Sequence, residues 1–220
     1  MVPSLSDDVR VLREDDRLLV AAKPSGLLSV PSPNASGRTL LDVFAKNGIT
    51  VLPVHRLDRD VSGAVVLAKD EPTRAKLEEL FRARLVRKIY WALAQGKLRP
   101  PQGIFDAPIR DEGAFAAVAS NGKPARTKYK TLRTFAKTTE VEVDLLTGRY
   151  NQIRLHFAHA GYPLVGERKY ARGKDAKMKA PRVALHARFL SFPHPWTDAP
   201  WEVESPLPPD LLAILAAAQG

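Results

Sequence analysis

The chain has no cysteine among its 220 residues. This absence excludes disulfide bonds, thiolate zinc sites, iron–sulfur clusters and cysteine nucleophiles. The chain also lacks an apolar run long enough to span a bilayer, and it has neither the basic start nor the apolar core of a secretory signal. No glycine-rich phosphate loop of standard spacing is present, which argues against a nucleotide cofactor. We therefore expect a cytoplasmic protein that uses no cofactor and contacts no membrane.

Positive charge is abundant and unevenly distributed. The formal net charge is +10, and residues 121–182 hold fifteen Lys and Arg against five Asp and Glu. Residues 74–99 hold eight Lys and Arg against only Glu78 and Glu79. Clustered positive charge is typical of a protein with a polyanionic partner. The alternative is an ordinary solubilising surface, so basicity alone does not decide the function.

Hydrophobic periodicity predicts an α+β fold. Period-two patterns and β-like runs predict strands at 9–13, 17–22, 64–68, 88–94, 126–133, 140–146, 183–192 and 201–204. Helices are expected after a Thr39 cap, from Pro72, from near Arg149 to Gly161, and over 208–218. Strands follow one another in runs and hairpins more often than they alternate with helices. This order favours a mixed, mostly antiparallel sheet with flanking helices over a doubly wound parallel sheet.

Residues 54–69 are the most informative segment. Within it one carboxylate, Asp58, lies between Arg56 and Arg59 and shortly before Gly63. Apolar residues on both sides predict that this loop lies at the edge of a core, and a nearby positive charge favours the ionised form of a carboxylate. An ionised, positioned Asp in a cleft is a candidate nucleophile or base. Asp58 is therefore the candidate catalytic residue.

The sequence argues against two other kinds of site, a metal site and an aspartic-protease site. His156 and His159 share a helix face, but no carboxylate at ligand spacing and no cysteine complete a metal site, so we expect no metal. The run 60–63 is loosely similar to the Asp-Thr-Gly of aspartic proteases, yet no second copy exists to form the required pair. Taken alone, Tyr90 is more typical of a core residue, and Arg154 of a surface residue.

Five segments stand out in chain order. They are Lys23-Pro24-Ser25-Gly26; His55-Arg56-Leu57-Asp58 followed by Ser62-Gly63; Lys88-Ile89-Tyr90; Thr147-Gly148-Arg149 with Gln152-Ile153-Arg154 and His156; and Leu185-His186-Ala187 with Phe192 and His194-Pro195. In this order they resemble the motifs of the RluA family of RNA pseudouridine synthases. The resemblance runs from about Leu12 to Pro209, nearly the whole chain. Val61 and Asn151 depart from it, standing where Thr and His are usual.

The resemblance implies a single catalytic domain, residues 1–220, with a central cleft and no separate N-terminal RNA-binding domain. It implies isomerisation of uridine to pseudouridine in structured RNA, either rRNA or tRNA. Because one chain carries every motif, we expect a monomer. The base is detached from the ribose at N1, turned, and rejoined through C5, which needs no redox change and no energy input. The target uridine must first leave its stack.

The resemblance also assigns roles to residues. Asp58 is the essential carboxylate, acting as a nucleophile or in an elimination route. Arg154 pairs with it, and Tyr90 lies against the uracil and assists with the C5 proton. Four residues are expected to bind the substrate. Arg56 fills the space that the base vacates. Lys23 and Arg149 contact the RNA backbone together with the basic strand 123–133, and Leu185 is the fourth substrate-binding residue.

Two functions from other classes stay open on the sequence. One is a non-catalytic RNA-binding or ribosome-assembly protein on the same fold. The other is a DNA glycosylase, which also flips bases and uses a carboxylate. Release of free uracil would identify a glycosylase, whereas an isomerase retains the base.

Overall fold

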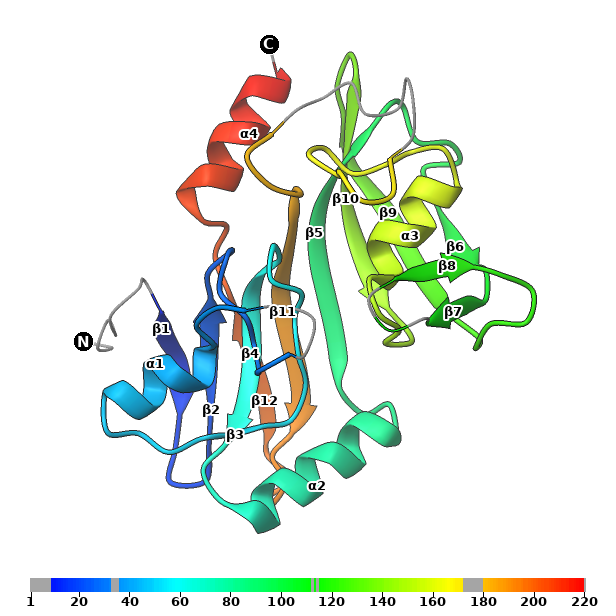
Figure 1. Cartoon of the computed structure of the whole chain (residues 1–220). Coiled ribbons are helices and arrows are strands. Elements are labelled where there is room, and N and C mark those ends of the chain that lie inside the picture. Colours follow the sequence, from blue (N-terminus) through cyan, green and yellow to red (C-terminus); the bar gives the residue numbers. More distant parts are fainter. Residues whose placement is uncertain (1–8, 33–35, 112, 114, 172–179, 220) are drawn as a thin grey trace. The chain divides into compact units, whose positions relative to one another are not determined.

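The computed structural model describes residues 9–32, 36–111, 113, 115–171 and 180–219, and these form two compact units (Figure 1). The first unit comprises residues 1–88 and 187–206, and the second 89–186 and 207–220. The chain passes from one unit to the other within β5 (Arg87–Gln95), within β11 (Leu185–Pro193), and again between Pro206 and Leu207. That residues 1–220 act as one catalytic domain stays a prediction.

The first unit contains a sheet with the strand order β1-β2-β4-β11. Its strands are β1 (Arg10–Glu14), β2 (Leu18–Lys23) and β4 (Ser62–Ala68), with the short β3 (Leu52–Pro53) on β4 and β12 (Pro200–Glu204) on β11. Strands β1 and β2, β2 and β4, and β11 and β12 pair antiparallel. Every residue of β4 is buried, so this strand lies at the centre of the unit.

Two helices belong to the first unit, and both begin as the sequence predicts. Helix α1 (Leu40–Lys46) starts with a capping box, in which Thr39 and Asp42 each accept the other's backbone N–H. Helix α2 (Glu71–Arg82) has Pro72 in its first turn and Asp70 as its cap, whose carboxylate accepts the N–H of Thr73.

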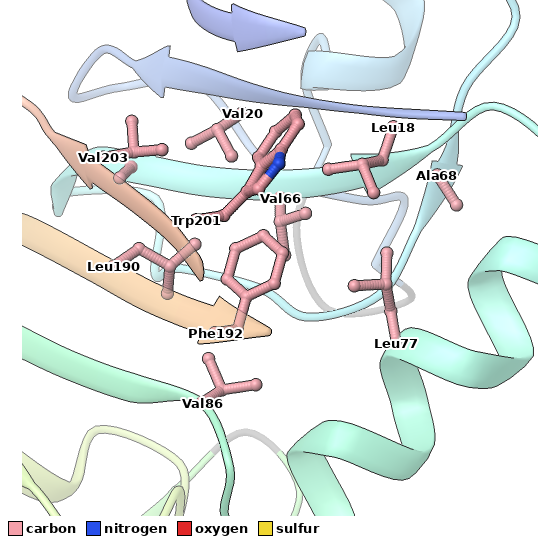
Figure 2. Close-up of a cluster of buried hydrophobic side chains, with 11 residues drawn as sticks. Leu18, Val20, Val66, Ala68, Leu77, Val86, Leu190, Phe192, Trp201 and Val203 are labelled. Carbon is pink, nitrogen blue, oxygen red and sulfur yellow. The ribbon is translucent and has the colours of Figure 1, made fainter. Parts of the chain in front are cut away.

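The core of the first unit joins its sheet to α2. Its side chains come from β2, β4, α2, β11 and β12, with Val86 from the segment between α2 and β5, and Figure 2 shows them converging around Trp201 and Phe192. The labelled members are Leu18, Val20, Val66, Ala68, Leu77, Val86, Leu190, Phe192, Trp201 and Val203. Ala64, Val66 and Ala68 of β4 belong to this core, which thereby supports the strand that follows the Asp58 loop.

The second unit has the strand order β5-β10-β9-β6. Its strands are β6 (Gln102–Asp106), β9 (Arg126–Thr134) and β10 (Thr138–Leu145), paired antiparallel, with a separate hairpin of β7 (Ile109–Asp111) and β8 (Ala116–Val118). Helices α3 (Gln152–His159) and α4 (Pro209–Gln219) complete it. The predicted α+β class with mostly antiparallel strand pairing is confirmed, whereas β3, β6, β7 and β8 were not predicted.

Candidate functional site

The loop that carries Asp58 connects β3 to β4 in the first unit. The N–H of Val61 donates to the carbonyl oxygen of Asp58 (3.1 Å) and closes a turn directly after the carboxylate. On the other side, Leu57 is buried, and its N–H donates to Ser29 Oγ (3.0 Å), whose hydroxyl donates to the Leu57 carbonyl (2.8 Å). The backbone is therefore held on both sides of the half-buried Asp58.

Lys23 fixes this loop through hydrogen bonds to backbone carbonyl oxygens. Its side chain is only 1% exposed, and Nζ donates to the carbonyl oxygens of Pro24 (2.9 Å), Leu27 (2.7 Å) and Arg59 (3.3 Å). The sequence predicted that Lys23 contacts the RNA backbone. Because its ammonium is buried and directed at three carbonyl oxygens, we assign it instead to the joining of the 23–27 turn to the Asp58 loop.

Three more hydrogen bonds join the same two segments. The N–H of Gly26 donates to the Arg59 carbonyl (2.8 Å), and Nε of Arg59 donates to the Gly26 carbonyl (3.0 Å). The hydroxyl of Ser25 donates to the Asp60 carbonyl (3.0 Å). These bonds give Arg59 and Asp60 a part in fixing the conformation around Asp58.

His55 attaches the start of the loop to β4. Its Nε2 accepts the backbone N–H of Val66 (3.1 Å), and its ring lies 4.8 Å from that of Phe81 on α2. Burial, together with the charge of Lys88, lowers the pKa of His55 to about 3. The imidazole is therefore neutral at pH 7, which leaves Nε2 able to accept this hydrogen bond.

Gly63 permits a close approach between β4 and β11. Its φ of +127° is a conformation that other residues rarely adopt, and a Cβ there would overlap the backbone carbonyl of Ala187. Arg56, in contrast, is exposed, as a residue that contacts RNA must be, and its role stays a prediction.

Arg154, the predicted partner of Asp58, lies on α3 in the second unit. Its guanidinium forms a bidentate ion pair with Glu167, with Nε–Oε2 at 2.6 Å and Nη2–Oε1 at 2.8 Å. The Glu167 side chain is fully buried, and Oε1 also accepts the N–H of Lys169 (2.7 Å) and Tyr170 (3.2 Å). Burial alone would raise the pKa of Glu167, but these hydrogen bonds and the charge of Arg154 lower it below its usual value.

Sequence reasoning missed Glu167, although a signal was present. It is one of only two acids in residues 167–181, a segment that holds six Lys and Arg. Asp58 belongs to the first unit and Arg154 to the second. The pairing of these two residues stays a prediction.

Tyr90 and Leu185 belong to the second unit. Tyr90 is on β5, directly opposite Val143 of β10, and is 7% exposed, while Leu185 begins β11 and is 3% exposed. Their contacts with a substrate base stay predictions, because low exposure is equally typical of core residues.

The segment before α3 is tied to β9. The N–H of Arg149 donates to Oε1 of Gln152 (3.0 Å), and the Gln152 amide donates to Oγ1 of Thr127 (3.0 Å). Arg149 itself is half-exposed, and Nε donates to the Pro124 carbonyl (3.2 Å). Along β9 the alternating residues Arg126, Lys128 and Lys130 are exposed, which supports the predicted contact of this basic strand with phosphate.

Asn151 accounts for one departure from the family pattern. It precedes α3 in the left-handed region (φ 51°, ψ 24°), where Asn and His are both enriched. Its Nδ2 donates to the hydroxyl of Tyr170 (2.6 Å). Asn therefore suits the backbone here and also links the start of α3 to the segment that follows Glu167.

His156 is held by two hydrogen bonds. Its Nε2 is 2.9 Å from the Ala107 carbonyl and Nδ1 is 2.8 Å from Oγ1 of Thr127. Since a carbonyl can only accept, Nε2 carries the proton, and burial lowers the pKa of this buried histidine. Within the described residues, no group of three or more His, Asp or Glu is placed to hold a metal ion, and no helix is long and apolar enough to cross a membrane.

Comparison with known proteins gives consistent matches. Residues 17–159 match the model of the RNA pseudouridylate synthase family. The chain is 38% identical, over 95% of its own length, to a ribosomal large subunit pseudouridine synthase D from Nitrosomonas europaea, and 40% identical, over 90%, to an uncharacterised RNA pseudouridine synthase from Chloroflexus aurantiacus. It spans 65% of the length of each of these relatives.

Solved structures agree with these matches. The fold is similar to that of human RNA pseudouridylate synthase domain containing 4, with a TM-score of 0.78, 26% identity, and coverage of 94% of this chain and 91% of that one. The human domain containing 1 has a TM-score of 0.79 at 25% identity, over 94% and 87% of the two chains. The likeness therefore extends over nearly all of this chain and most of each human one.

Proposed function

The chain belongs to the RNA pseudouridylate synthase family, and on this premise we propose that it isomerises uridine to pseudouridine in structured RNA. One observation carries the proposal: Asp58, the motif carboxylate, is intact and lies on a loop held by hydrogen bonds from Lys23, Ser25, Ser29 and Gly26. A non-catalytic RNA-binding protein would have no need to fix the backbone around one carboxylate in this way.

The proposed roles of the other residues follow. Asp58 is the essential carboxylate, as a nucleophile or in an elimination route, and Arg154 pairs with it. Tyr90 lies against the uracil near C5, and Leu185 contacts the base. Arg56 enters the space that the flipped uridine leaves, because a planar guanidinium can stack on bases and bond to phosphate.

The RNA is rRNA or tRNA, and rRNA is the first substrate to test, because the similar Nitrosomonas europaea protein is named for the large ribosomal subunit. The exposed cations of β9 and the half-exposed Arg149 contact its phosphates. The protein works in the cytoplasm, as a monomer, without a cofactor.

The proposed reaction can be assayed by the release of tritium from C5 of uridine. When the base is rejoined through C5, the hydrogen on C5 passes to solvent, so rRNA labelled with tritium at C5 of uridine should release tritium. An isomerase releases no free uracil, whereas a glycosylase does. Release of uracil, or no release of tritium from either rRNA or tRNA, would contradict the proposed activity.

A further inference from the structure

A hollow of about 380 Å³ lies beside α3, within the second unit. Its walls come from β8, α3 and the segment that follows Glu167. The side chains that matter for binding are Phe115, His159, Lys169 and Tyr170, and none of the described residues that line the hollow is acidic. Its volume is at the lower end of the range of small-ligand sites.

Two aromatic rings border this hollow. Phe115 is 43% exposed, and its ring centroid lies 5.9 Å from that of Tyr170, at 57° between the ring planes. The exposed part of the Phe115 ring is therefore open to a stacking partner from solution. Unpaired bases of RNA stack on such rings without regard to their sequence.

Lys169 places a positive charge over the same rings. Its Nζ lies 5.5 Å from the centroid of Phe115, 5.5 Å from that of Tyr170 and 5.1 Å from that of Tyr150. The ammonium group of this flexible side chain thus lies close to three aromatic rings. The ammonium can move to a phosphate while a base takes the ring face.

The wall formed by Tyr170 is rigidly attached. Its hydroxyl accepts from Asn151 (2.6 Å), and its N–H donates to Oε1 of Glu167 (3.2 Å). Its ring also lies 5.5 Å from the guanidinium carbon of Arg154. The hollow is therefore connected through fixed contacts to the buried ion pair of α3, and a ligand bound there lies close to that pair.

We propose that this hollow binds one unpaired nucleotide of the RNA, with its base stacked on Phe115 and its phosphate paired with Lys169. The inference rests on the proposed function only in taking RNA as the ligand. It adds a second contact with a nucleotide that is not the one modified. The site accepts any base, because a stacked ring is read by its face and not by its hydrogen-bonding edge.

The test uses a fluorescein-labelled oligoadenylate, which contains no uridine and cannot be isomerised. Phe115→Ala should weaken its binding about tenfold, and Phe115→Trp should retain it. Leu212→Ala, which removes another exposed apolar side chain of the same unit, should leave the affinity unchanged. Lys169→Met should lower the slope of log affinity against log salt by about 0.7, the value for one phosphate contact on a single strand.

A photoreactive 8-azidoadenosine within the oligonucleotide locates the site independently. It should label the peptide that contains Phe115 or the one that contains Tyr170. Unchanged affinity in Phe115→Ala, an equal loss in Leu212→Ala, or labelling confined to other peptides would overturn the inference. Absence of tritium release by the wild-type protein would overturn the proposed isomerisation instead, because oligoadenylate binding does not depend on it.

Discussion

Arg154 and Glu167 form a bidentate ion pair in the interior of the second unit, with N–O distances of 2.6 and 2.8 Å. Glu167 also accepts two backbone N–H groups, so the carboxylate that orients the arginine is itself fixed. A buried guanidinium that retains its charge needs such a partner. We therefore regard Glu167 as the residue that positions Arg154.

Glu167→Gln should destabilise the protein strongly. It leaves the Arg154 charge buried without its bidentate partner, which costs about 3–5 kcal/mol. Urea unfolding measures the loss. Glu204→Gln is the matched control, because Glu204 forms a surface ion pair with Arg188 (3.0 Å) whose loss should cost about 1 kcal/mol or less. Equal losses in the two variants would contradict the positioning role.

Lys23→Met should reduce pseudouridine formation and leave RNA affinity nearly unchanged. It removes the donor shared by three carbonyl oxygens, including that of Arg59 beside Asp58, and should lower the free energy of unfolding by about 1–3 kcal/mol. Filter binding and tritium release measure the two effects separately. Lys46→Met, on the exposed end of α1, should change neither. If Lys23 contacts RNA as the sequence predicted, affinity falls instead.

Gly63→Ala should destabilise the protein by about 3 kcal/mol or more, because it adds overlap with the Ala187 carbonyl to an unfavourable backbone conformation. Gly48→Ala is the control in the same unit, since Gly48 also has positive φ (+72°) but nothing within 4 Å of the added Cβ. That variant should lose only about 1–2 kcal/mol. Thermal or urea unfolding of both compares backbone strain with and without steric overlap.

His55 should make stability depend on pH in the acidic range. Its pKa is about 3 in the folded protein and 6.5 ordinarily, so the unfolded chain binds the proton more tightly. The contribution of neutral His55 is fully present above pH 6.5 and is lost progressively as the pH falls toward 3. Between pH 7 and pH 5 this amounts to at most about 2 kcal/mol.

The comparison that isolates His55 is with His55→Gln, which can accept the Val66 N–H without titrating. The wild-type protein should lose more stability than this variant between pH 7 and pH 5. The buried His156, whose pKa is also lowered, is present in both proteins and cancels. Parallel pH profiles would show that His55 is not held neutral by the fold.

Local signals predicted much of the fold. The Thr39 cap and Pro72 lie within one turn of the helices that they start, and β4 is a continuous apolar run, so neighbouring residues determine these elements. Strands β6, β7 and β8 were missed because they are short. β6 also forms through pairing with the distant β9, whereas β7 and β8 form a hairpin of only three residues on each strand.

Some residues of the candidate site could likewise be predicted from the sequence, and others could not. Asp58 and Arg56 were found from sequence because a motif marks them. The burial of Lys23 was not predicted, since lysine is almost never fully buried unless its charge has partners. Its partners are backbone carbonyl oxygens, which every residue carries and which no sequence pattern reveals. The pairing of Arg154 with Glu167 likewise depends on the path of the chain after α3.

The most direct measurement is pseudouridine formation by Asp58→Asn, together with its RNA affinity and its urea unfolding. The backbone hydrogen bonds of the loop do not involve the carboxylate, so the fold should persist. We expect product formation to fall at least about a thousandfold, with affinity and stability close to those of the wild-type protein. Retained pseudouridine formation by this variant would contradict the assignment of Asp58 as the catalytic carboxylate.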